Sequence, residues 1–335
     1  MAVECDIQTA ESMACKALER AGVSPDNAHS VVRALIAAEI DGIASHGLSR
    51  VAYYADQAAS GKVKGDAEPR LTEHGAVINI DAAEGLAFPA IDRGVSPLVD
   101  RARQLGLAAL SISNSHHFGV VGHHVEAIAR EGLVAIAFGN TPAAIAPWGG
   151  KQPLFGTNPI AFAAPREGED ALVIDLSVSK IARGKVMMAQ NRGEPIPDDW
   201  ALDSEGQATT DAAAAMAGSI RPIGDAKGSS LALMVELLTA GLSGSSFGYE
   251  ASSLFTAEGA PPRLGQLFIA IDPSFFAAGS AFSERVEAIL SAMLNEEGVR
   301  LPGARRLTAR AASRTTLTLD DNVYAEIVRR SQSDP

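Results

Sequence analysis

Glycine spacing is the feature of this sequence that most constrains its fold. The chain has 31 glycines in 335 residues, and no two of them are separated by a single residue. This spacing excludes the G-x-G-x-x-G fingerprint of Rossmann dinucleotide sites, which requires such a pair. No Gly-Lys pair is followed by Ser or Thr, so the Walker-type phosphate loop is absent too. Two common nucleotide-binding architectures are therefore excluded.

The charge balance limits the partners that the chain can have. Lys and Arg together number 28 and Asp and Glu number 40, which gives a formal net charge of −12. An acidic surface repels phosphate backbones, so we expect no nucleic-acid partner. With 47% hydrophobic and 20% charged residues, the chain can bury a sizeable core. Its length predicts about two domains.

The cysteines and the N-terminus indicate a cellular compartment. Cys5 and Cys15 form no C-x-x-C motif and are too few for a disulfide framework, which favours a reducing cytoplasm. The acids Glu4 and Asp6 and the lack of an apolar run argue against a secretory signal. The uncharged stretch 132–150 contains two prolines and four glycines and is a poor membrane span. We expect a soluble cytoplasmic protein with no membrane partner.

Apolar segments separated by helical stretches indicate an α/β protein. Helices are expected over Pro97–Leu105 and His124–Arg130, between predicted strands. Continuous Ala, Leu, Ile and Val runs are typical of strands covered on both faces. The predicted strands are Val77–Asp81, Leu107–Ser113, Leu133–Asn140, Ile160–Ala164, Leu172–Leu176 and Leu267–Asp272.

Further helices are predicted on either side of this region. Ser24-Pro25 has the signature of a helix start, with an N-cap Ser and Pro at the first position. The segment Ser230–Leu242 is strongly apolar and is expected to be a buried helix. Glu284–Glu297 has one apolar face and is expected to be amphipathic. Ala189–Ala217 shows little periodicity and is expected to be a long surface excursion.

The first candidate site is Asp41–Arg50, where a helix gives way to glycine-punctuated chain. It carries Ser45, His46 and Arg50 close together. A His can exchange a proton, a neighbouring hydroxyl can orient it, and Arg can hold a carboxylate through two hydrogen bonds. The alternative is a loop His beside a solvated Arg.

The second candidate, Asn114–His124, holds four of the seven histidines. His117 and His124 could share a helix face and bind a metal, but no acid or Cys lies at ligand spacing. Gly119 and Gly122 also argue against a continuous helix. A strand–glycine loop–helix pattern favours seating a phosphate against backbone N–H groups.

Three further segments offer polar groups beside apolar runs. Asn140–Gly150 with Phe155–Pro159 could bind a ligand or could be tight turns. Asp175–Lys185 has an acid at a strand end that suits ribose hydroxyls, followed by cations; the alternative is a solvated helix start. Gly224–Ser230 is a Gly-rich turn or a plain N-cap.

The order of these segments resembles the malate/L-lactate dehydrogenase family of the non-Rossmann type. The matching blocks run from about residue 30 to residue 305 and include Ser-His-Gly-Leu-Ser-Arg and Gly-Thr-Asn-Pro. Lys227-Gly-Ser-Ser-Leu-Ala is similar to the Δ1-piperideine-2-carboxylate/Δ1-pyrroline-2-carboxylate reductase branch, as are Gln152–Pro159 and Arg300–Gly303. Arg183-Gly-Lys185 departs from that branch, which can have His-Gly-Asp.

The resemblance implies an α/β fold with a mixed-sheet NAD(P)-binding domain and a smaller helical domain. The sheet domain would span residues 73–284 with the excursion 189–217. The helical domain would comprise residues 1–72 and returning chain from about 285 to 335. Members of the family are typically homodimers, so a homodimer is expected.

The resemblance also implies an activity. The chain would be an NAD(P)H-dependent reductase of cyclic imino acids, transferring hydride to C2 and giving L-pipecolate or L-proline. A small-molecule carboxylate is the expected substrate, and NADPH is the expected cofactor, with NADH as the alternative. A dehydrogenase of a 2-hydroxy acid such as L-malate, L-lactate or ureidoglycolate is the same-family alternative. A non-catalytic metal-binding protein using the 116–124 histidines is a third hypothesis.

The residues implied for each role follow block by block. His46 would be the proton donor with Ser45 orienting it. Lys185 would occupy the position of the imine reductases' relay Asp, although as a cation it cannot act as that acceptor. Substrate binding is assigned to Arg50, Thr157, Arg183 and Gly184. Cofactor binding is assigned to His117, Phe118, Gly119, Val120, Val121, Asp175, Leu176, Ser177, Asp225, Ala226, Lys227, Arg300, Leu301, Pro302, Gly303, Ala304 and Arg305. Arg300, Arg305 and Arg306 form a basic cluster that could meet the 2′-phosphate of NADPH.

Overall fold

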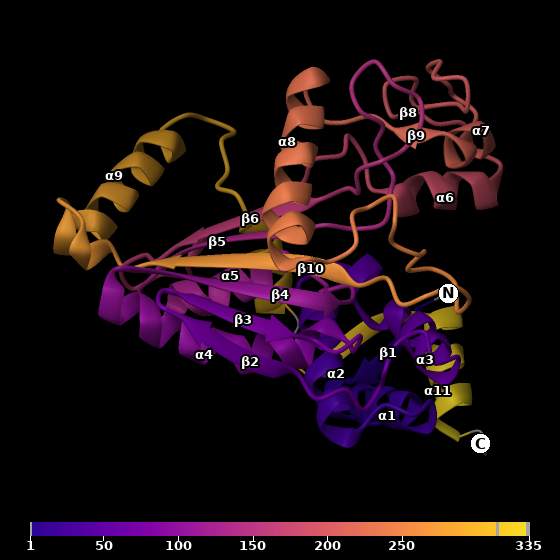
Figure 1. Ribbon diagram of the computed structural model, residues 1–335, viewed down its shortest axis with the longest axis horizontal. Coiled ribbons are helices and arrows are strands. Elements are labelled where there is room, and N and C mark those ends of the chain that lie inside the picture. Colours follow the sequence, from indigo (N-terminus) through magenta and orange to yellow (C-terminus); the bar gives the residue numbers. More distant parts are fainter. Residues whose placement is uncertain (1, 313–314, 333–335) are drawn as a thin grey trace.

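A seven-stranded mixed sheet lies at the centre of the computed structural model, which describes residues 2–312 and 315–332 (Figure 1). The predicted terminal regions 1–72 and 285–335 thus include positions 1, 313–314 and 333–335, which lie outside the described residues. The strand order is β2-β3-β4-β10-β5-β6-β7. The strands are β2 (Arg70–His74), β3 (Val77–Asp81), β4 (Leu107–Ser115), β5 (Val134–Gly139), β6 (Pro159–Ala164), β7 (Leu172–Ser177) and β10 (Leu264–Ile271).

All six predicted strands are confirmed, with small shifts at their ends. The β3–β4 pair is parallel, and every other neighbouring pair in the seven-stranded sheet is antiparallel. Strand β10 comes late in the sequence but lies between β4 and β5. This insertion brings the loop that precedes β10 beside the loops that follow β4 and β5.

Two helices cover one face of the sheet. They are α4 (Ala87–Leu105) and α5 (Val121–Arg130). The side chains of Leu110 and Ile112 on β4 point into the core beneath them and are fully buried. Helix α4 ends as predicted but begins well before Pro97, which lies inside the helix. The prediction that began this helix at Pro97 is therefore wrong.

The opposite face of the sheet is only partly covered, by α8 (Ala226–Glu236) and the π-helical segment Leu237–Gly241 (Figure 1). The prediction of strands covered on both faces is corrected accordingly. The predicted burial of α8 holds for one side only, since Ala232, Val235 and Glu236 are buried whereas Leu237 is 53% exposed. The physical reason is that nothing in the described chain packs against the outer side of this helix.

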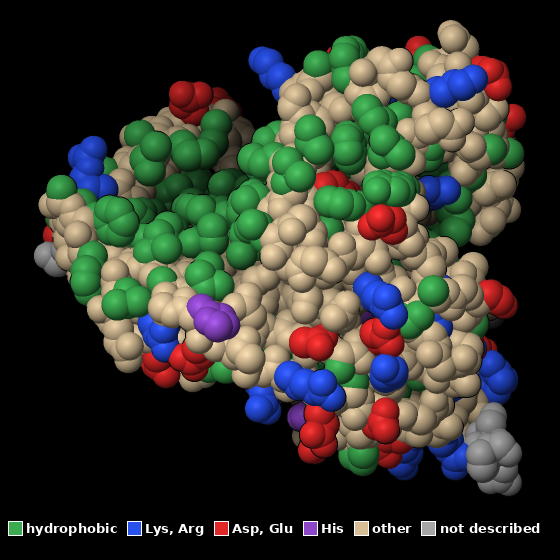
Figure 2. All heavy atoms as spheres, in the orientation of Figure 1, with side chains coloured by type: hydrophobic (Ala, Val, Ile, Leu, Met, Phe, Trp, Pro, Cys, Tyr) green, Lys and Arg blue, Asp and Glu red, His purple; other side chains and the backbone are tan. Residues whose placement is uncertain are grey.

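Helix α9 (Phe282–Leu294) stands away from the sheet, as Figure 1 shows. Its predicted apolar face does not enter a core of this chain: only Leu290 is buried, and Ile289 is 62% exposed. Figure 2 shows that apolar side chains gather in a hollow between α9 and α8. Two apolar helix surfaces therefore face a shared open space.

A second core is built from the N-terminal helices and returning C-terminal chain. Helices α1 (Ile7–Arg20), α2 (Pro25–Ile40) and α3 (Val51–Ala59) pack around buried leucines and Tyr54. Helix α2 begins at Pro25 with Ser24 as N-cap, as predicted. Strand β1 (Ala2–Asp6) pairs with β11 (Thr316–Asp320), and α11 (Asp321–Gln332) packs on the same core. We call this unit the helical cluster.

The excursion predicted over Ala189–Ala217 is folded. It contains the end of α6 (Arg183–Arg192), β8 (Ala201–Leu202) and α7 (Ala212–Ala217), and β9 (Ser219–Ile220) follows. These elements have their own small apolar core. Cys5 and Cys15 are free, as predicted. Within residues 2–312 and 315–332, no helix is both long and apolar enough to cross a membrane.

Candidate active site

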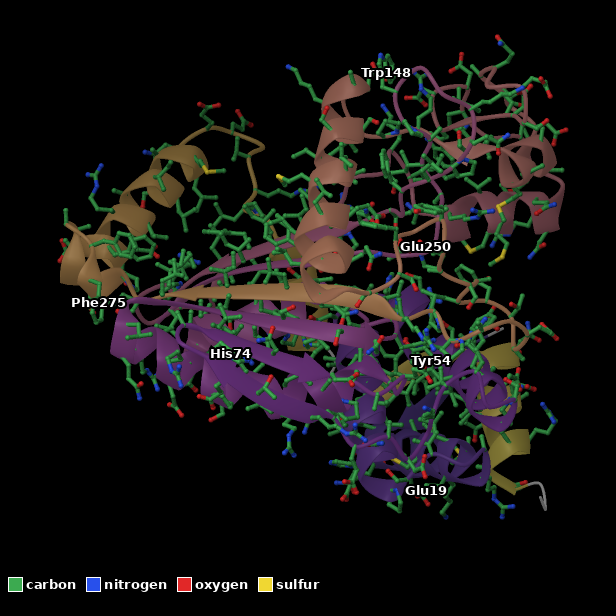
Figure 3. The ribbon with its side chains drawn as sticks, viewed as in Figure 1. Glu19, Tyr54, His74, Trp148, Glu250 and Phe275 are labelled. Atoms are coloured by element: carbon green, nitrogen blue, oxygen red, sulfur yellow. The ribbon has the colours of Figure 1, made fainter. Side chains whose placement is uncertain are left out.

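A cleft of about 1110 Å³ lies between the helical cluster and the sheet. In Figure 3, Tyr54 marks the helical side of this region and Glu250 marks the loop on its other side. Most residues predicted for the site line this cleft. They are His46, Arg50, His117, Phe118, Gly119, Val120, Val121, Thr157, Asp175, Leu176, Ser177, Arg183, Gly184 and Arg300–Arg305.

Two short 3-10 helices, Ala44–His46 and Leu48–Arg50, carry the first motif into the cleft between α2 and α3. The Glu39 carboxylate accepts a hydrogen bond of 2.7 Å from the Leu48 amide and fixes this turn. A side chain at Gly47 would collide with that carboxylate, so the sequence needs glycine here. Because the chain changes here from helix α2 to these short turns, the side chains of His46 and Arg50 both point into the cleft.

His46 is positioned as a proton-transfer group. The Ser45 hydroxyl lies 3.0 Å from Nδ1 of His46, and Nε2 has no hydrogen-bond partner within the described ranges. Burial, together with the positive charge of Arg50, lowers the pKa of His46 to about 4. The imidazole is therefore neutral near pH 7 and ready to accept a proton.

Arg50 and Arg183 bring two positive charges to the cleft. Arg50 donates from Nε to the Ser45 carbonyl at 2.8 Å and lies 5.2 Å from the centre of the Phe255 ring. Arg183 donates to the carbonyls of Ala143 and Met216, and burial lowers its pKa. Neither guanidinium has a carboxylate partner in the described part of the chain. Two buried or half-buried cations of this kind fit anionic groups of a ligand.

His117 lines the cleft, and the buried Tyr54 lies directly behind it. The Tyr54 hydroxyl lies 2.6 Å from Nδ1 of His117, and the rings of His117 and His46 stack with their centres 5.4 Å apart. Burial raises the pKa of Tyr54 and lowers that of His117. Both groups are thus neutral near pH 7.

The predicted histidine cluster is not a metal site. His116 bonds to Gln57, His123 to the Asp41 carboxylate and His124 to the Phe118 carbonyl. Because the bonded nitrogen of each of the four rings has a different partner, the four histidines do not converge. Within the described ranges, no three side chains of His, Cys, Asp or Glu lie together as metal ligands. The hypothesis of a metal-binding protein built on this cluster is therefore not supported.

The loop after β4 and the start of α5 form the part of the cleft assigned to the cofactor. Asp175, at the end of β7, accepts a hydrogen bond of 2.7 Å from the Gly122 amide in the first turn of α5. Burial raises the pKa of Asp175, although the N–H of Gly122 opposes this. Segment Arg300–Arg306 lies across the same region, and Gly303, at φ +79°, approaches the Val173 carbonyl closely.

The predicted basic cluster is only partly available to a ligand. Arg300 and Arg305 have no carboxylate partner in the described residues. Arg306, by contrast, is buried between the carboxylates of Asp41 and Glu126. Arg306 also lines the cleft, and these two carboxylates partly compensate its charge, so its contact with a phosphate stays a prediction.

Some predicted residues lie outside the cleft lining. Ser45 acts only through His46. Lys185 is exposed on α6 two residues after Arg183, and residues at that spacing point to opposite sides of a helix. Asp225–Lys227 lie at the start of α8, where Asp225 pairs with Arg221. The cleft of a single chain therefore does not include these five predicted positions.

Sequence reasoning missed one wall of the cleft entirely. Tyr249, Ser253 and Phe255 line it from the loop before β10. The residue types in Gly248–Phe255 do not distinguish this segment from an ordinary loop. Thr141, which also lines the cleft, lay in the segment Asn140–Gly150, for which ligand binding and tight turns were left as alternatives.

Comparison with known proteins decides the family. Residues 5–328 match the profile described as malate/L-lactate dehydrogenase. The chain belongs to this family. It is therefore an NAD(P)-dependent oxidoreductase, and both the predicted family resemblance and the non-Rossmann mixed-sheet fold are confirmed.

Relatives in this family act on different substrates. The (2R)-3-sulfolactate dehydrogenase (NADP(+)) of Chromohalobacter salexigens is 59% identical over 321 residues, covering 96% of each chain. The Δ1-pyrroline-2-carboxylate/Δ1-piperideine-2-carboxylate reductase of Pseudomonas syringae pv. tomato is 41% identical over 294 residues, 87% of this chain and 85% of the relative. The crystal structure of Δ1-piperideine-2-carboxylate reductase from the same organism superimposes with a TM-score of 0.92 at 36% identity, covering 98% and 99%. The sulfolactate relative is thus more similar in sequence than the imine reductase.

Proposed function

We propose that this member of the malate/L-lactate dehydrogenase family is an NADP-dependent dehydrogenase of a 2-hydroxy acid that carries a second anionic group, with (2R)-3-sulfolactate as the favoured substrate. In the reverse direction it would reduce the corresponding 2-oxo acid, sulfopyruvate. The observation that carries this proposal is the pair of arginines, Arg50 and Arg183, that line one cleft without carboxylate partners in the described residues.

Two arginines suit a dianion better than a monoanion. Arg50 would hold the C1 carboxylate beside His46, since the two residues come from one turn. Arg183, with its pKa lowered by burial, would regain stabilisation from the sulfonate on C3. A substrate with a single carboxylate would leave one buried cation unpaired, which is unfavourable. The identity of 59% to a sulfolactate dehydrogenase agrees with this reasoning.

His46 would act as the general base in oxidation. Its neutral imidazole accepts the proton of the C2 hydroxyl through Nε2, while Ser45 fixes the ring through Nδ1. Bound NADP+ supplies the hydride acceptor for C2. In reduction the same nitrogen returns the proton to the carbonyl oxygen. Because the His46 ring is neutral in the free site, the free site has the protonation state that oxidation requires.

The cleft has the donors that an NADP molecule requires. At the first turn of α5 the Gly122 amide is already taken by the Asp175 carboxylate, so side chains would supply the positive charge that the phosphates need. Arg300 and Arg305 supply positive charge on segment Arg300–Arg306, on the same side of the cleft. Asp175 offers a carboxylate oxygen that could accept from a ribose hydroxyl. These residues would bind and orient the cofactor.

Reduction of Δ1-piperideine-2-carboxylate or Δ1-pyrroline-2-carboxylate with NADPH is the second candidate. It is favoured by the close structural match to a piperideine reductase and by the Lys227-Gly-Ser-Ser sequence. In this reaction Arg50 alone would hold the carboxylate, and His46 would protonate the ring nitrogen. Arg183 would then have no anionic group to bind.

A substrate panel with paired variants tests the choice. We would follow NADPH and NADH oxidation with sulfopyruvate, oxaloacetate, pyruvate and both cyclic imines. The proposal expects the highest kcat/KM for sulfopyruvate with NADPH. Arg183→Met should lower that value by about 10-fold or more, since a charged hydrogen bond is lost, and should leave pyruvate turnover nearly unchanged. A higher kcat/KM for a cyclic imine, together with no effect of Arg183→Met on that value, would instead support the second candidate.

The assembly and compartment are also proposed rather than observed. A second copy of the chain would cover the apolar hollow between α8 and α9, giving a homodimer. The apolar side chains in this hollow are more extensive than soluble monomers usually expose. Two free cysteines fit a reducing cytoplasm.

A further inference from the structure

Glu236 is a buried carboxylate with no role in the chemistry proposed above. Its side chain lies on α8, the residue is only 2% exposed, and no Lys, Arg or His pairs with it in the described chain. Its two oxygens instead accept four hydrogen bonds. The donors are Asn140 Nδ2 at 3.2 Å, Gly156 N at 3.0 Å, Asn158 Nδ2 at 2.9 Å and Gly248 N at 3.0 Å.

The four donors come from two loops. Asn140 begins the β5–β6 loop, Gly156 and Asn158 end it, and Gly248 lies in the loop before β10. Each loop contributes cleft-lining residues, including Thr141, Thr157 and Tyr249. One carboxylate thus joins both ends of the β5–β6 loop to the loop before β10.

The loop before β10 has a second anchor at its other end. Lys62 is also 2% exposed and follows α3 in the helical cluster. Its ammonium donates to the carbonyls of Ser253, Thr256 and Glu258 at 2.5, 3.0 and 2.9 Å. Lys62 has no carboxylate partner in the described residues. Its charge is therefore satisfied by the loop backbone alone.

Between the two anchors the loop presents two aromatic side chains to the cleft. Tyr249 follows directly after Gly248, and Phe255 lies between two carbonyls bound by Lys62. The ring of Phe255 packs 5.2 Å from the Arg50 guanidinium. The position of this loop therefore decides how Arg50 is packed and how much room a substrate has.

We propose that Glu236 and Lys62 are positioning residues that stretch the loop 248–258 between the sheet and the helical cluster, and so set the substrate side of the cleft. The Glu236 carboxylate accepts hydrogen bonds from N–H groups only, and the Lys62 ammonium donates hydrogen bonds to carbonyl oxygens only. Neither touches the cofactor side. Their action is felt through Tyr249, Phe255 and Arg50, and the substrate class rests on the function proposed above.

Glu236→Gln and Lys62→Met test this inference. In Glu236→Gln the new NH2 group faces N–H donors, so part of the connection between the two loops is lost with almost no change of volume. We expect each variant to raise KM for the 2-oxo acid by about 10-fold or more. The dissociation constant of NADPH should stay within about twofold, since the cofactor contacts lie on the other side of the cleft.

Hydrogen exchange gives a readout that does not need turnover. Amides of 246–258 should exchange faster in both variants, and those of 154–158 only in Glu236→Gln. Thr239→Val, equally buried on the π-helical continuation of α8, and Lys64→Met, an exposed lysine near Lys62, are the controls and should change neither readout.

The outcomes separate this inference from the proposed function. A folded Glu236→Gln with wild-type KM and wild-type exchange overturns the positioning role. An equal loss of substrate and NADPH affinity with slowed turnover indicates general damage and also overturns it. Wild-type protein that turns over no acid in the panel overturns the proposed function alone, because loop exchange still reports on the anchors.

Discussion

At the scale of single residues, the reactivity of the site depends on burial acting on His46. Burial lowers its pKa to about 4, so the imidazole is neutral at pH 7 and has a free nitrogen that can accept a proton. Replacement by alanine removes the proton acceptor, and we expect kcat of oxidation to fall by about 10²-fold or more. NADPH binding, measured by fluorescence titration, should be retained. His74→Ala, an exposed histidine in β2 (Figure 3), is the control; unchanged turnover in His46→Ala would remove His46 from this role.

The grouping of candidate site residues could be predicted where one short segment carries the whole motif. Ser45, His46 and Arg50 lie within a single turn, so their order along the chain already places them together. Arg183 and Thr157 lay in segments recognised as candidates from their residue types, and only the family resemblance assigned them to substrate binding. Glu236 was missed, because its donors come from two loops that lie far apart in sequence. No local pattern can indicate such an environment.

At the scale of elements, α10 (Ala304–Ala312) is held over the cleft by charge rather than by an apolar face. Arg310 donates to both oxygens of Asp41 and both oxygens of Glu126, at 2.8–3.0 Å. Burial opposes ionisation of Asp41, but Arg310 and His123 outweigh it and hold the pKa at about 2. Asp41 ends α2 and Glu126 lies on α5, so one arginine joins both units to α10.

Loss of that arginine should loosen the cofactor side. In Arg310→Met the buried carboxylates of Asp41 and Glu126 keep only Arg306 and more exposed cations as partners. Removing one partner of a buried ion pair costs about 3–5 kcal/mol of stability. We expect a lower free energy of unfolding in urea and a higher dissociation constant for NADPH. Thr308→Val on the same helix is the control. Unaltered NADPH affinity would contradict the anchoring role of α10.

The strands and helices were predicted more reliably than the contacts that they make with the rest of the molecule. The six sheet strands follow from short apolar runs whose period and length are local properties. The exposed sides of α8 and α9 were not predictable, because an apolar helix face is the same in sequence whether it meets a core or another subunit. The position of β10 between β4 and β5 also depends on contacts between distant parts of the chain.

At the scale of the whole molecule, buried histidines make stability depend on pH. Burial lowers the pKa of His46 to about 4, of His116 to about 3 and of His124 to about 4, from a usual value of 6.5. Between about pH 6.5 and 4 the unfolded chain therefore binds protons that the folded chain excludes. The free energy of unfolding should fall as pH falls through this window.

Urea unfolding at half-unit pH steps measures this effect. The expected slope is on the order of 1 kcal/mol per pH unit for each histidine that remains neutral. Asp41 contributes in the same sense but at lower pH, since its folded pKa of about 2 lies below the usual 3.8 and its stabilisation is lost as pH falls through that range. A free energy of unfolding that is flat from pH 6.5 to 4.5 would contradict the assignment of buried neutral rings.

The apolar hollow predicts a homodimer that surface charge can disrupt. Leu237→Glu with Ile289→Glu introduces carboxylates on both helices that line the hollow, where Leu237 and Ile289 are 53% and 62% exposed. Light scattering after gel filtration should find a dimer for the wild type and a monomer for the double variant. Met188→Glu, at an exposed methionine of α6, should leave the dimer intact. A wild-type monomer at micromolar concentration would contradict the proposal.

The pairing of β1 with β11 joins the first residues of the chain to nearly the last. His46 and Arg50 belong to the helical cluster that this pair and α11 complete. During synthesis the sheet strands emerge before the segment that finishes this cluster. A nascent chain can therefore form the sheet side of the cleft early, whereas the proton-transfer side waits for residues 316–332. Premature termination near residue 315 should thus yield a protein that holds cofactor but lacks an ordered base.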